Sequence, residues 1–213
     1  MERFICILIG YVFGLLQTGY LYGKMNHIDI RQHGSGNAGT TNALRTLGWK
    51  AGIITFIGDC FKCIVAVVVV YLIFGKSHTE MMPLLGMYAG IGAVLGHNFP
   101  FYLGFKGGKG IAVTAGIMLS TNIWIALIAM GTFLLVVGIT RYVSLGSLLM
   151  VTLFLVEVVI YGQLGGFHVT QSHLYEMYAI AVVLLMSAVF KHKANIKRLL
   201  TGTENKLNLS KKK

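Results

Sequence analysis

The segment 51-AGIITFIGDCFKCIVAVVVVYLIF-74 decides the fold class of this protein. It carries only two charged residues, Asp59 and Lys62, and its apolar positions do not alternate with polar ones as they would in a half-buried strand. An α-helix needs about 20 mainly apolar residues to cross the hydrocarbon of a bilayer. The segment therefore predicts a membrane-spanning helix.

Six further apolar runs flank this helix, over residues 4–23, 82–103, 111–119, 122–139, 143–162 and 174–190. Of the 213 residues 55% are apolar and 12% are charged, whereas a soluble domain carries roughly 25% charged residues. We predict an all-α integral membrane protein with about seven transmembrane helices, forming one domain over residues 1–213. The run at 111–119 would span only about 14 Å as a helix, so this fourth helix is expected to be short or broken.

The distribution of Lys and Arg predicts the orientation. With seven crossings and the N-terminus outside, fifteen of the eighteen basic residues lie on one side, and only Arg3 and Lys76 lie on the other. Basic residues concentrate in cytoplasmic loops, so we expect an outer N-terminus and a cytoplasmic C-terminal tail over residues 192–213. The net charge of +11 is explained in this way, and no nucleic acid is expected as a partner.

Three polar segments fall on the predicted cytoplasmic side, and the first is 31-RQHGSGNAGTTNALRTLG-48. Glycines 34, 36 and 39 allow positive φ and a close approach of backbone N–H groups to an anion. Arg45 adds a charged fork that matches phosphate oxygens. Neutral donors come from Ser35, Asn37, Thr40, Thr41 and Asn42. The segment predicts a phosphate cradle, with an ordinary loop and helix cap as the alternative.

The second segment is 96-GHNFPFYLGFKGGKGIAV-113. Two lysines flank a glycine pair just before a helix, where N–H groups and the helix dipole favour an anion. These residues are Lys106, Gly107, Gly108, Lys109 and Gly110. The sequence is no Walker A motif, so nucleotide hydrolysis is not expected. A basic turn without a ligand is the alternative, and His97 is either a satisfied helix-end histidine or a support for the turn.

The third segment is 191-KHKANIKRLLTGTENKL-207. His192 and Asn195 are three residues apart and would share one face of a helical extension, with Lys191 and Arg198 near that face. The segment can complete a site at the membrane surface. An amphipathic basic tail lying on anionic lipid is the alternative.

The charged pair within the second helix has two interpretations. Asp59 and Lys62 are also three residues apart, so they can neutralise each other in the apolar helix. Alternatively, Asp59 reaches the cytoplasmic cations and orients Arg45 or Lys106. The sequence supports both equally.

Taken in this order, the three segments resemble the bacterial acyl-phosphate:glycerol-3-phosphate acyltransferases, the PlsY family. The family pattern is similar to GSGN-x-G-x-TN-x-x-R, GH-x-FP with FKGGKG, and H-x-x-NI-x-R-L-x-x-G-x-E, all found between residues 34 and 204. The resemblance implies transfer of a fatty acyl group from acyl phosphate to the sn-1 hydroxyl of glycerol 3-phosphate. The products would be lysophosphatidate and inorganic phosphate, in the first acylation step of phospholipid synthesis.

The resemblance also implies the setting. The protein would lie in the bacterial inner (plasma) membrane with its active site on the cytoplasmic side, and it would need no cofactor and no metal. Its partners would be glycerol 3-phosphate, long-chain acyl phosphate, membrane lipids and, by contact, the enzyme that forms the acyl phosphate.

Carried over by motif, the resemblance assigns roles to residues. His192 and Asn195 would be catalytic. Glycerol 3-phosphate would be held by Ser35, Arg45, Lys106, His192 and Asn195. Acyl phosphate would be held by Asn37, Gly107, Gly108, Lys109 and Gly110. Support would come from Thr41, Asn42, Asp59, His97, Arg198 and Glu204, with Glu204 anchoring the tail to Arg45 or Lys106.

Two known acyl-transfer motifs are missing from the sequence. The sequence has no H-x-x-x-x-D pair and no G-x-S-x-G elbow, so an acyl-serine intermediate is not expected. We expect direct attack by the glycerol hydroxyl, with its proton passing to a substrate phosphate oxygen rather than to His192, because no carboxylate is spaced to hold this histidine in a base tautomer. The competing function classes are a membrane transporter of phosphate-bearing anions and a lipid-binding scaffold.

Overall fold

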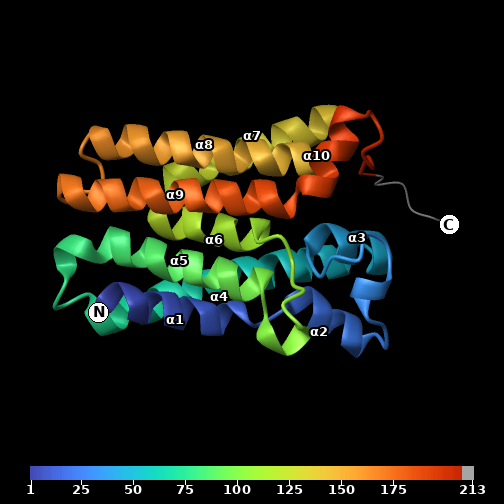
Figure 1. The fold of residues 1–213 in the computed structure, drawn as a ribbon, viewed down its shortest axis with the longest axis horizontal. Helices are drawn as coiled ribbons and strands as arrows, with labels where there is room; N and C mark the ends of the chain where they lie inside the picture. The colour runs from blue at the N-terminus through green and yellow to red at the C-terminus, as the bar shows by residue number, and fades with distance from the viewer. Residues whose placement is uncertain (208–213) are drawn as a thin grey trace.

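The computed structural model describes residues 1–207, and this part of the chain is helical with no strand. The helices lie side by side along one long axis (Figure 1). They are α1 Glu2–Gly14, α2 Thr18–Met25, α3 Thr40–Leu47, α4 Trp49–Phe74, α5 Met82–Asn98, α6 Ile111–Thr121, α7 Ile123–Thr140, α8 Val143–Gln163, α9 Gln171–Lys191 and α10 Lys193–Leu200. Short 3-10 turns occur at Ile30–Gln32, Thr79–Met81 and Phe101–Leu103. The prediction of an all-α fold is confirmed.

Within residues 1–207, five segments are long and apolar enough to cross a membrane. They are Glu2–Met25, Trp49–Phe74, Ile123–Thr140, Val143–Gln163 and Gln171–Lys191. Helix α5 has 17 residues and α6 has 11. At a rise of 1.5 Å per residue α6 is about 16 Å long, so the fourth apolar run does form a short helix. The number of membrane crossings stays a prediction.

The first apolar run, 4–23, is not the continuous helix that its composition predicts. It is divided into α1 and α2 by the non-helical residues 15–17. Side chains satisfy carbonyls freed at the break: Gln17 Nε2 donates to Gly14 O, and Lys62 Nζ donates to Leu16 O. Gln17 Nε2 also donates to His97 O and so connects the break to α5. A break of this kind needs such partners in an apolar environment.

The run at 82–103 also ends earlier than its composition predicts. Helix α5 stops at Asn98, because Pro100 disfavours the helical region for the residue before it, and Phe99 has φ −135° and ψ 58°. A 3-10 turn at Phe101–Leu103 then leads the chain away from the helix axis. The segment after the turn is therefore free to return to the end of α5.

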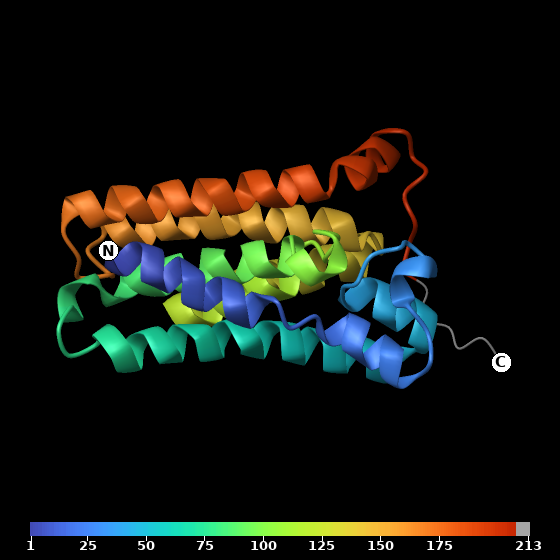
Figure 2. The same ribbon diagram turned by 60° about the horizontal axis from the view of Figure 1, so that its bottom comes forward.

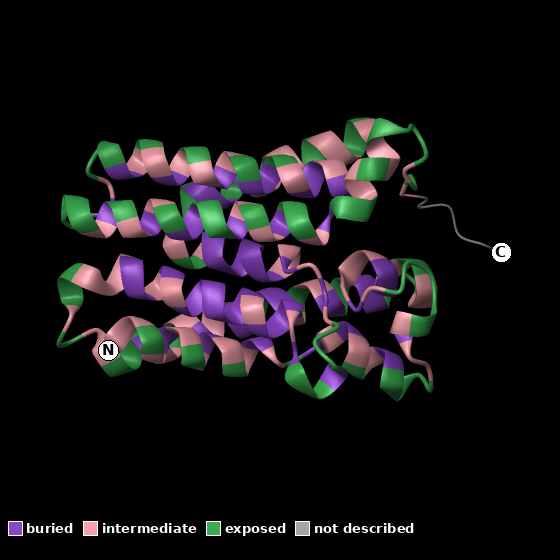
Figure 3. Ribbon diagram, viewed as in Figure 1, coloured by how far each residue is buried: buried purple, intermediate pink, exposed green. Residues whose placement is uncertain are grey.

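Close backbone contact between α1 and α5 fixes the centre of the bundle. A Cβ on Gly10 would lie 1.9 Å from Ala89 O, and a Cβ on Gly96 would lie 2.2 Å from Tyr11 O. Small residues at helix contacts allow this approach in membrane proteins. Buried residues gather on the inward faces and along α5, whereas exposed residues face outward (Figure 3). The outward faces carry large apolar side chains such as Leu72 and Trp124, as expected for a surface in lipid.

The three polar segments meet at one end of the bundle. Helices α2, α3 and α10 and the loop before α6 lie at the end opposite to the N-terminus (Figures 1 and 2). The described chain leaves this end at Leu207, whose backbone N–H donates to Arg141 O at 2.8 Å. The rest of the expected tail, residues 208–213 with Lys211, Lys212 and Lys213, lies outside the described residues.

Candidate active site

A cavity of about 710 Å³ opens among the three polar segments. Its polar part is lined by cations and neutral donors, among them Ser35, Asn37, Thr40, Thr41, Arg45, Lys109, Lys191, His192, Asn195 and Arg198. Its apolar part is lined mainly from α4, α6, α7 and α8, by residues such as Ile53, Phe56, Ala112, Ala115, Met130, Phe133, Leu134 and Met150. The cavity can therefore hold a molecule that is anionic at one end and apolar at the other.

The N-termini of three helices contribute to this lining. They belong to α3 at Thr40, to α6 at Ile111 and to α10 at Ala194. Each helix N-terminus carries unpaired N–H groups and a partial positive charge. The N–H groups of Lys109 and Gly110 have no hydrogen-bond partner anywhere in the part of the chain that the structure describes. Anions of the phosphate type are stabilised at such a place.

The glycine-rich loop before α3 uses part of its backbone amides internally. Gly34 and Gly36 have positive φ, as predicted, but Gly39 has φ −92°. The N–H groups of Ser35, Gly36 and Gly39 are used within the loop. The donors available to an anion on this side include the side chains of Ser35, Asn37 and Arg45 and the first turn of α3.

Asn42 organises this loop. Its side chain donates to Ile30 O at 2.8 Å and to His33 O at 3.0 Å, and it accepts from the Ser35 N–H at 2.8 Å. The residue is buried, so its amide is occupied by the loop. Asn37 accepts the Gly39 N–H at 2.9 Å and lines the cavity beside it. Asn42 therefore supports the site by holding the loop in place, whereas Asn37 and Thr41 line the cavity.

Lys106 lies outside the cavity, contrary to the sequence-based assignment. It is exposed, and it is not among the residues that line the cavity. Lys106 follows a left-handed turn at Gly104 and Phe105, with φ 62° and 59°, and Gly107 and Gly108 separate it from Lys109, the lysine that does reach the cavity. The contact with phosphate predicted for Lys106 is thus available to Lys109 instead.

Gly107 and Gly108 also differ from their predicted role. Their N–H groups donate to Asn98 O at 3.3 Å and to His97 O at 3.1 Å, so they are not free for a phosphate. A Cβ on Gly107 would lie 1.9 Å from His97 O, and one on Gly108 would lie 2.0 Å from His97 Nε2. The two glycines let the loop lie directly on the end of α5. Gly110, which is left-handed at φ 81°, then opens α6 at the cavity.

Lys109, Asn195 and Glu204 form a connected set. Lys109 Nζ donates to Asn195 Oδ1, and Asn195 Nδ2 donates to Glu204 Oε1 at 2.8 Å. The Asn195 amide is therefore fixed in one orientation. The pKa of Lys109 is lowered to about 8, chiefly by burial; Glu204 opposes this change and nearby cations contribute to it. Binding of an anion would favour the charged lysine.

Glu204 does not anchor the tail to Arg45 or Lys106 as predicted. Its second oxygen accepts from Arg198 Nε at 2.8 Å. The chain reverses at Gly202, which has φ 68°, and this brings the carboxylate back onto α10. Arg45 has no carboxylate partner within residues 1–207. It remains available to an anion.

His192 lies at the junction of α9 and α10 and is buried beside the cavity. Its Nδ1 lies 2.8 Å from Ala188 O. Because a carbonyl only accepts, Nδ1 carries the proton and Nε2 keeps its lone pair. Burial, and then the Lys109 cation, lower the pKa of His192 to about 4. The Ala188 carbonyl thus holds His192 in the tautomer that a general base requires, a role for which the sequence offered no suitably spaced carboxylate.

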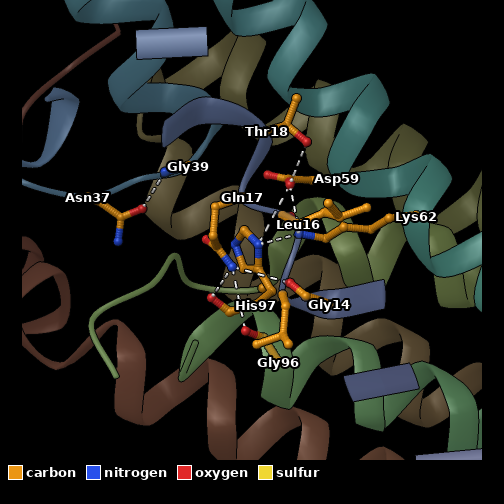
Figure 4. A network of polar contacts seen from close by, with 12 residues as sticks. Gly14, Leu16, Gln17, Thr18, Asn37, Gly39, Asp59, Lys62, Gly96 and His97 are labelled. Carbon is orange, nitrogen blue, oxygen red and sulfur yellow. Dashed lines mark hydrogen bonds and ion pairs between the residues drawn. The ribbon is translucent and has the colours of Figure 1, made fainter. Parts of the chain in front are cut away.

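Asp59 forms a buried network and makes no contact with Arg45 or Lys106. Its Oδ1 accepts from Lys62 Nζ at 2.9 Å and from Thr18 Oγ1 at 3.1 Å (Figure 4). Lys62 Nζ also lies 2.9 Å from His97 Nδ1. Of the two interpretations of this acidic residue, the pairing with Lys62 is confirmed. Asp59 and His97 nevertheless both line the cavity.

Some lining residues could not be recognised in the sequence. Ser144 and Ser147 of α8 bring hydroxyl groups to the cavity, and Met130 and Phe133 of α7 bring apolar surface. These residues lie in runs that read as ordinary membrane helices. Only the packing of α7 and α8 against α6 shows which of their faces meets the site.

Comparison with known proteins agrees with this geometry. A family model described as glycerol-3-phosphate acyltransferase matches residues 4–202. The chain belongs to this family. It is similar to the glycerol-3-phosphate acyltransferases of Clostridioides difficile (strain 630), with 40% identity over 99% of this chain and 100% of the relative, and of Chlorobium phaeobacteroides (strain DSM 266), with 38% identity over 93% and 94%.

Two solved structures have the same fold. They are the glycerol 3-phosphate and lysophosphatidic acid forms of PlsY (YgiH), an integral membrane glycerol 3-phosphate acyltransferase. The first has a TM-score of 0.84 and 28% identity over 98% of this chain and 96% of that one; the second has a TM-score of 0.82. The predicted family and the predicted class, an all-α integral membrane protein, are confirmed, and the chain is a multi-pass membrane protein.

Proposed function

We propose that this acyltransferase moves a fatty acyl group from acyl phosphate to the sn-1 hydroxyl of glycerol 3-phosphate, releasing inorganic phosphate and lysophosphatidate in the first acylation step of phospholipid synthesis. The observation that carries the proposal is one cavity in which an anion-binding part adjoins an apolar part. Acyl phosphate has this two-part character. The ligands named for the solved relatives, glycerol 3-phosphate and lysophosphatidic acid, are a substrate and a product of the same reaction.

The two phosphates would occupy neighbouring positions. Glycerol 3-phosphate would be held on the α3 side by Ser35 and Arg45, with His192 and Asn195 near its hydroxyl. Acyl phosphate would be held at the N-terminus of α6, by the free N–H groups of Lys109 and Gly110 and by the lysine ammonium group. The acyl chain would then follow the apolar part between α4, α6, α7 and α8. Because Lys109 donates to Asn195, the two positions share one set of hydrogen bonds.

The reaction would be a direct displacement. The glycerol hydroxyl oxygen forms the new bond to the acyl carbonyl carbon, the bond from that carbon to the phosphate oxygen breaks, and phosphate leaves with the electron pair. The hydroxyl proton passes to a substrate phosphate oxygen. His192 Nε2 is the alternative acceptor, because its lone pair is free. Alignment of the reactants supplies much of the rate, since effective molarities reach about 10⁵ M or more.

The proposed setting is the bacterial inner (plasma) membrane, with the cavity on the cytoplasmic side. It rests on the basic residues gathered at the cavity end of the bundle, among them Arg45, Lys109 and Arg198. The same rule supports seven crossings, with the N-terminus outside and the C-terminus inside. Contact with the enzyme that forms the acyl phosphate remains a prediction.

The purified protein in detergent, with radiolabelled glycerol 3-phosphate, tests the proposal. Palmitoyl phosphate should give labelled lysophosphatidate, whereas palmitoyl-CoA and palmitoyl-acyl carrier protein should not. Equal turnover with palmitoyl-CoA would reject acyl phosphate as the donor. No product with any donor, together with uptake of labelled glycerol 3-phosphate into sealed vesicles, would instead favour the transporter of phosphate-bearing anions.

A further inference from the structure

The buried network around Lys62 has a defined pattern of donors and acceptors. Lys62 Nζ has three polar neighbours: Leu16 O, Asp59 Oδ1 and His97 Nδ1. The carbonyl and the carboxylate oxygens only accept, and an ammonium group has three N–H donors. A charged Lys62 beside an ionised Asp59 therefore satisfies all three contacts and leaves the pair neutral overall, as a buried ion pair requires.

This pattern determines the state of His97. If Nδ1 accepts from the Lys62 ammonium group, the ring is neutral and its proton is on Nε2. The imidazole thus presents an N–H donor on the side opposite to Lys62. Thr18, which donates to Asp59 Oδ1, and the Leu16 carbonyl hold the other members of the network in place (Figure 4).

The Nε2 side of His97 faces the loop that leads into α6. A Cβ on Gly108 would lie 2.0 Å from Nε2, so the ring edge touches this glycine. Nε2 makes no hydrogen bond within residues 1–207. It is also not one of the fully buried polar atoms that lack a partner, so part of its surface is accessible. His97 lines the cavity, and its Nε2 edge touches Gly108, the residue before Lys109 and Gly110, whose N–H groups also have no partner within residues 1–207.

A doubly charged phosphate is a poor ligand for this donor. Asp59 also lines the cavity, and its Oδ2 has no hydrogen-bond partner in the described chain. Because Lys62 balances the charge of Asp59, a phosphate placed here would lose its hydration without a compensating net positive charge, whereas Arg45 and Lys109 offer it one. A carbonyl oxygen is neutral until the hydroxyl attacks, so it can approach His97 without this cost. Donors aimed at such an oxygen act in the transition state.

We propose that His97 Nε2–H donates to the carbonyl oxygen of the acyl phosphate and stabilises the negative charge that develops there, and that Lys62 and Asp59 are positioning residues that hold His97 in the required tautomer. The inference rests on the proposed function and adds a catalytic residue to it. Ala112 and Ala115 of α6 line the same cavity, so the acyl chain would extend from the carbonyl along its apolar part.

A pair of substitutions tests the donor. In His97→Gln the amide nitrogen replaces Nε2, whereas in His97→Asn the shorter side chain has a nitrogen only near the Nδ1 position. We expect His97→Asn to lower kcat by about 10²- to 10³-fold, the effect of losing one such donor, and His97→Gln to recover most of this loss. KM for both substrates and the inhibition constant of a long-chain acyl phosphonate should stay near wild type. His168→Asn, at an exposed loop position away from the cavity, is the matched control.

The outcomes separate the two proposals. Wild-type protein without activity toward palmitoyl phosphate would reject the proposed function itself. Active wild type with His97→Asn within about threefold of it, or with only a raised KM, would overturn the role of His97. ¹⁵N NMR of histidine-labelled wild-type protein gives a test that needs no active variant: His97 should show a protonated Nε2 and an unprotonated Nδ1. The reverse tautomer would also overturn the inference.

Discussion

Replacing Lys109 by Met tests which of the two lysines in the FKGGKG segment contributes to activity. The substitution keeps an unbranched side chain of similar length and removes the ammonium group. Lys109 lines the cavity beside the free N–H groups at the start of α6 and donates to Asn195, whereas Lys106 is exposed outside it. We therefore expect the loss of activity to follow Lys109, with Lys106→Met as the matched control.

The expected magnitude follows from the contact that is lost. A hydrogen bond between charged groups contributes about 1.5–3 kcal/mol, which corresponds to about a 10- to 150-fold fall in kcat/KM. An exposed charge contributes about 1 kcal/mol or less, so Lys106→Met should stay within about fivefold of wild type. The assay is steady-state formation of lysophosphatidate from palmitoyl phosphate, with folding checked by gel filtration in detergent. A larger loss in Lys106→Met than in Lys109→Met would refute the assignment.

The pKa of Lys109 adds a second measurement. Burial brings it to about 8, and a bound phosphate stabilises the charged form. Below pH 8 Lys109 is charged, and its full contribution to the binding of acyl phosphate is present. As the pH rises through about 8 this charge is lost, so kcat/KM for acyl phosphate should fall. Lys109→Arg keeps its charge over this range, and the alkaline limb should disappear. An identical limb in wild type and Lys109→Arg would assign it to another group.

Three further predictions concern Arg45, His192 and the topology. Arg45→Lys keeps the charge but loses the fork, and kcat/KM should fall about 10- to 150-fold in a folded protein; near wild-type kinetics would remove Arg45 from the site. With the pKa of His192 near 4, an acidic limb near pH 6 in the wild-type profile should come from the second ionisation of a substrate phosphate and survive in His192→Gln; its loss, with unchanged KM, would favour His192 as the base. On a Cys-free background, single cysteines at the exposed positions 106 and 205 should be protected from an external thiol reagent in intact cells and one at exposed position 168 should react; labelling of position 205 from outside would exclude the proposed orientation.

The amino-acid sequence by itself predicted the fold class, a short or broken helix at 111–119 and the family. These depend on local quantities. An apolar run reveals a membrane helix whatever its neighbours are, and a motif is recognised by the order and spacing of its residues. The meeting of the three polar segments at one end of the bundle also followed from the sequence, because basic residues collect on one side of the membrane.

Only the tertiary structure decided which groups of those segments meet in the cavity. Lys106 is exposed outside the cavity, and the packing of Gly107 and Gly108 on the end of α5 occupies amides that the motif seemed to offer. The tautomers of His97 and His192 depend on Lys62 and on a backbone carbonyl, neither of which a motif includes. Side-chain direction and hydrogen-bond partners are set by contacts between distant segments, so they cannot be predicted from the spacing of residues along the chain.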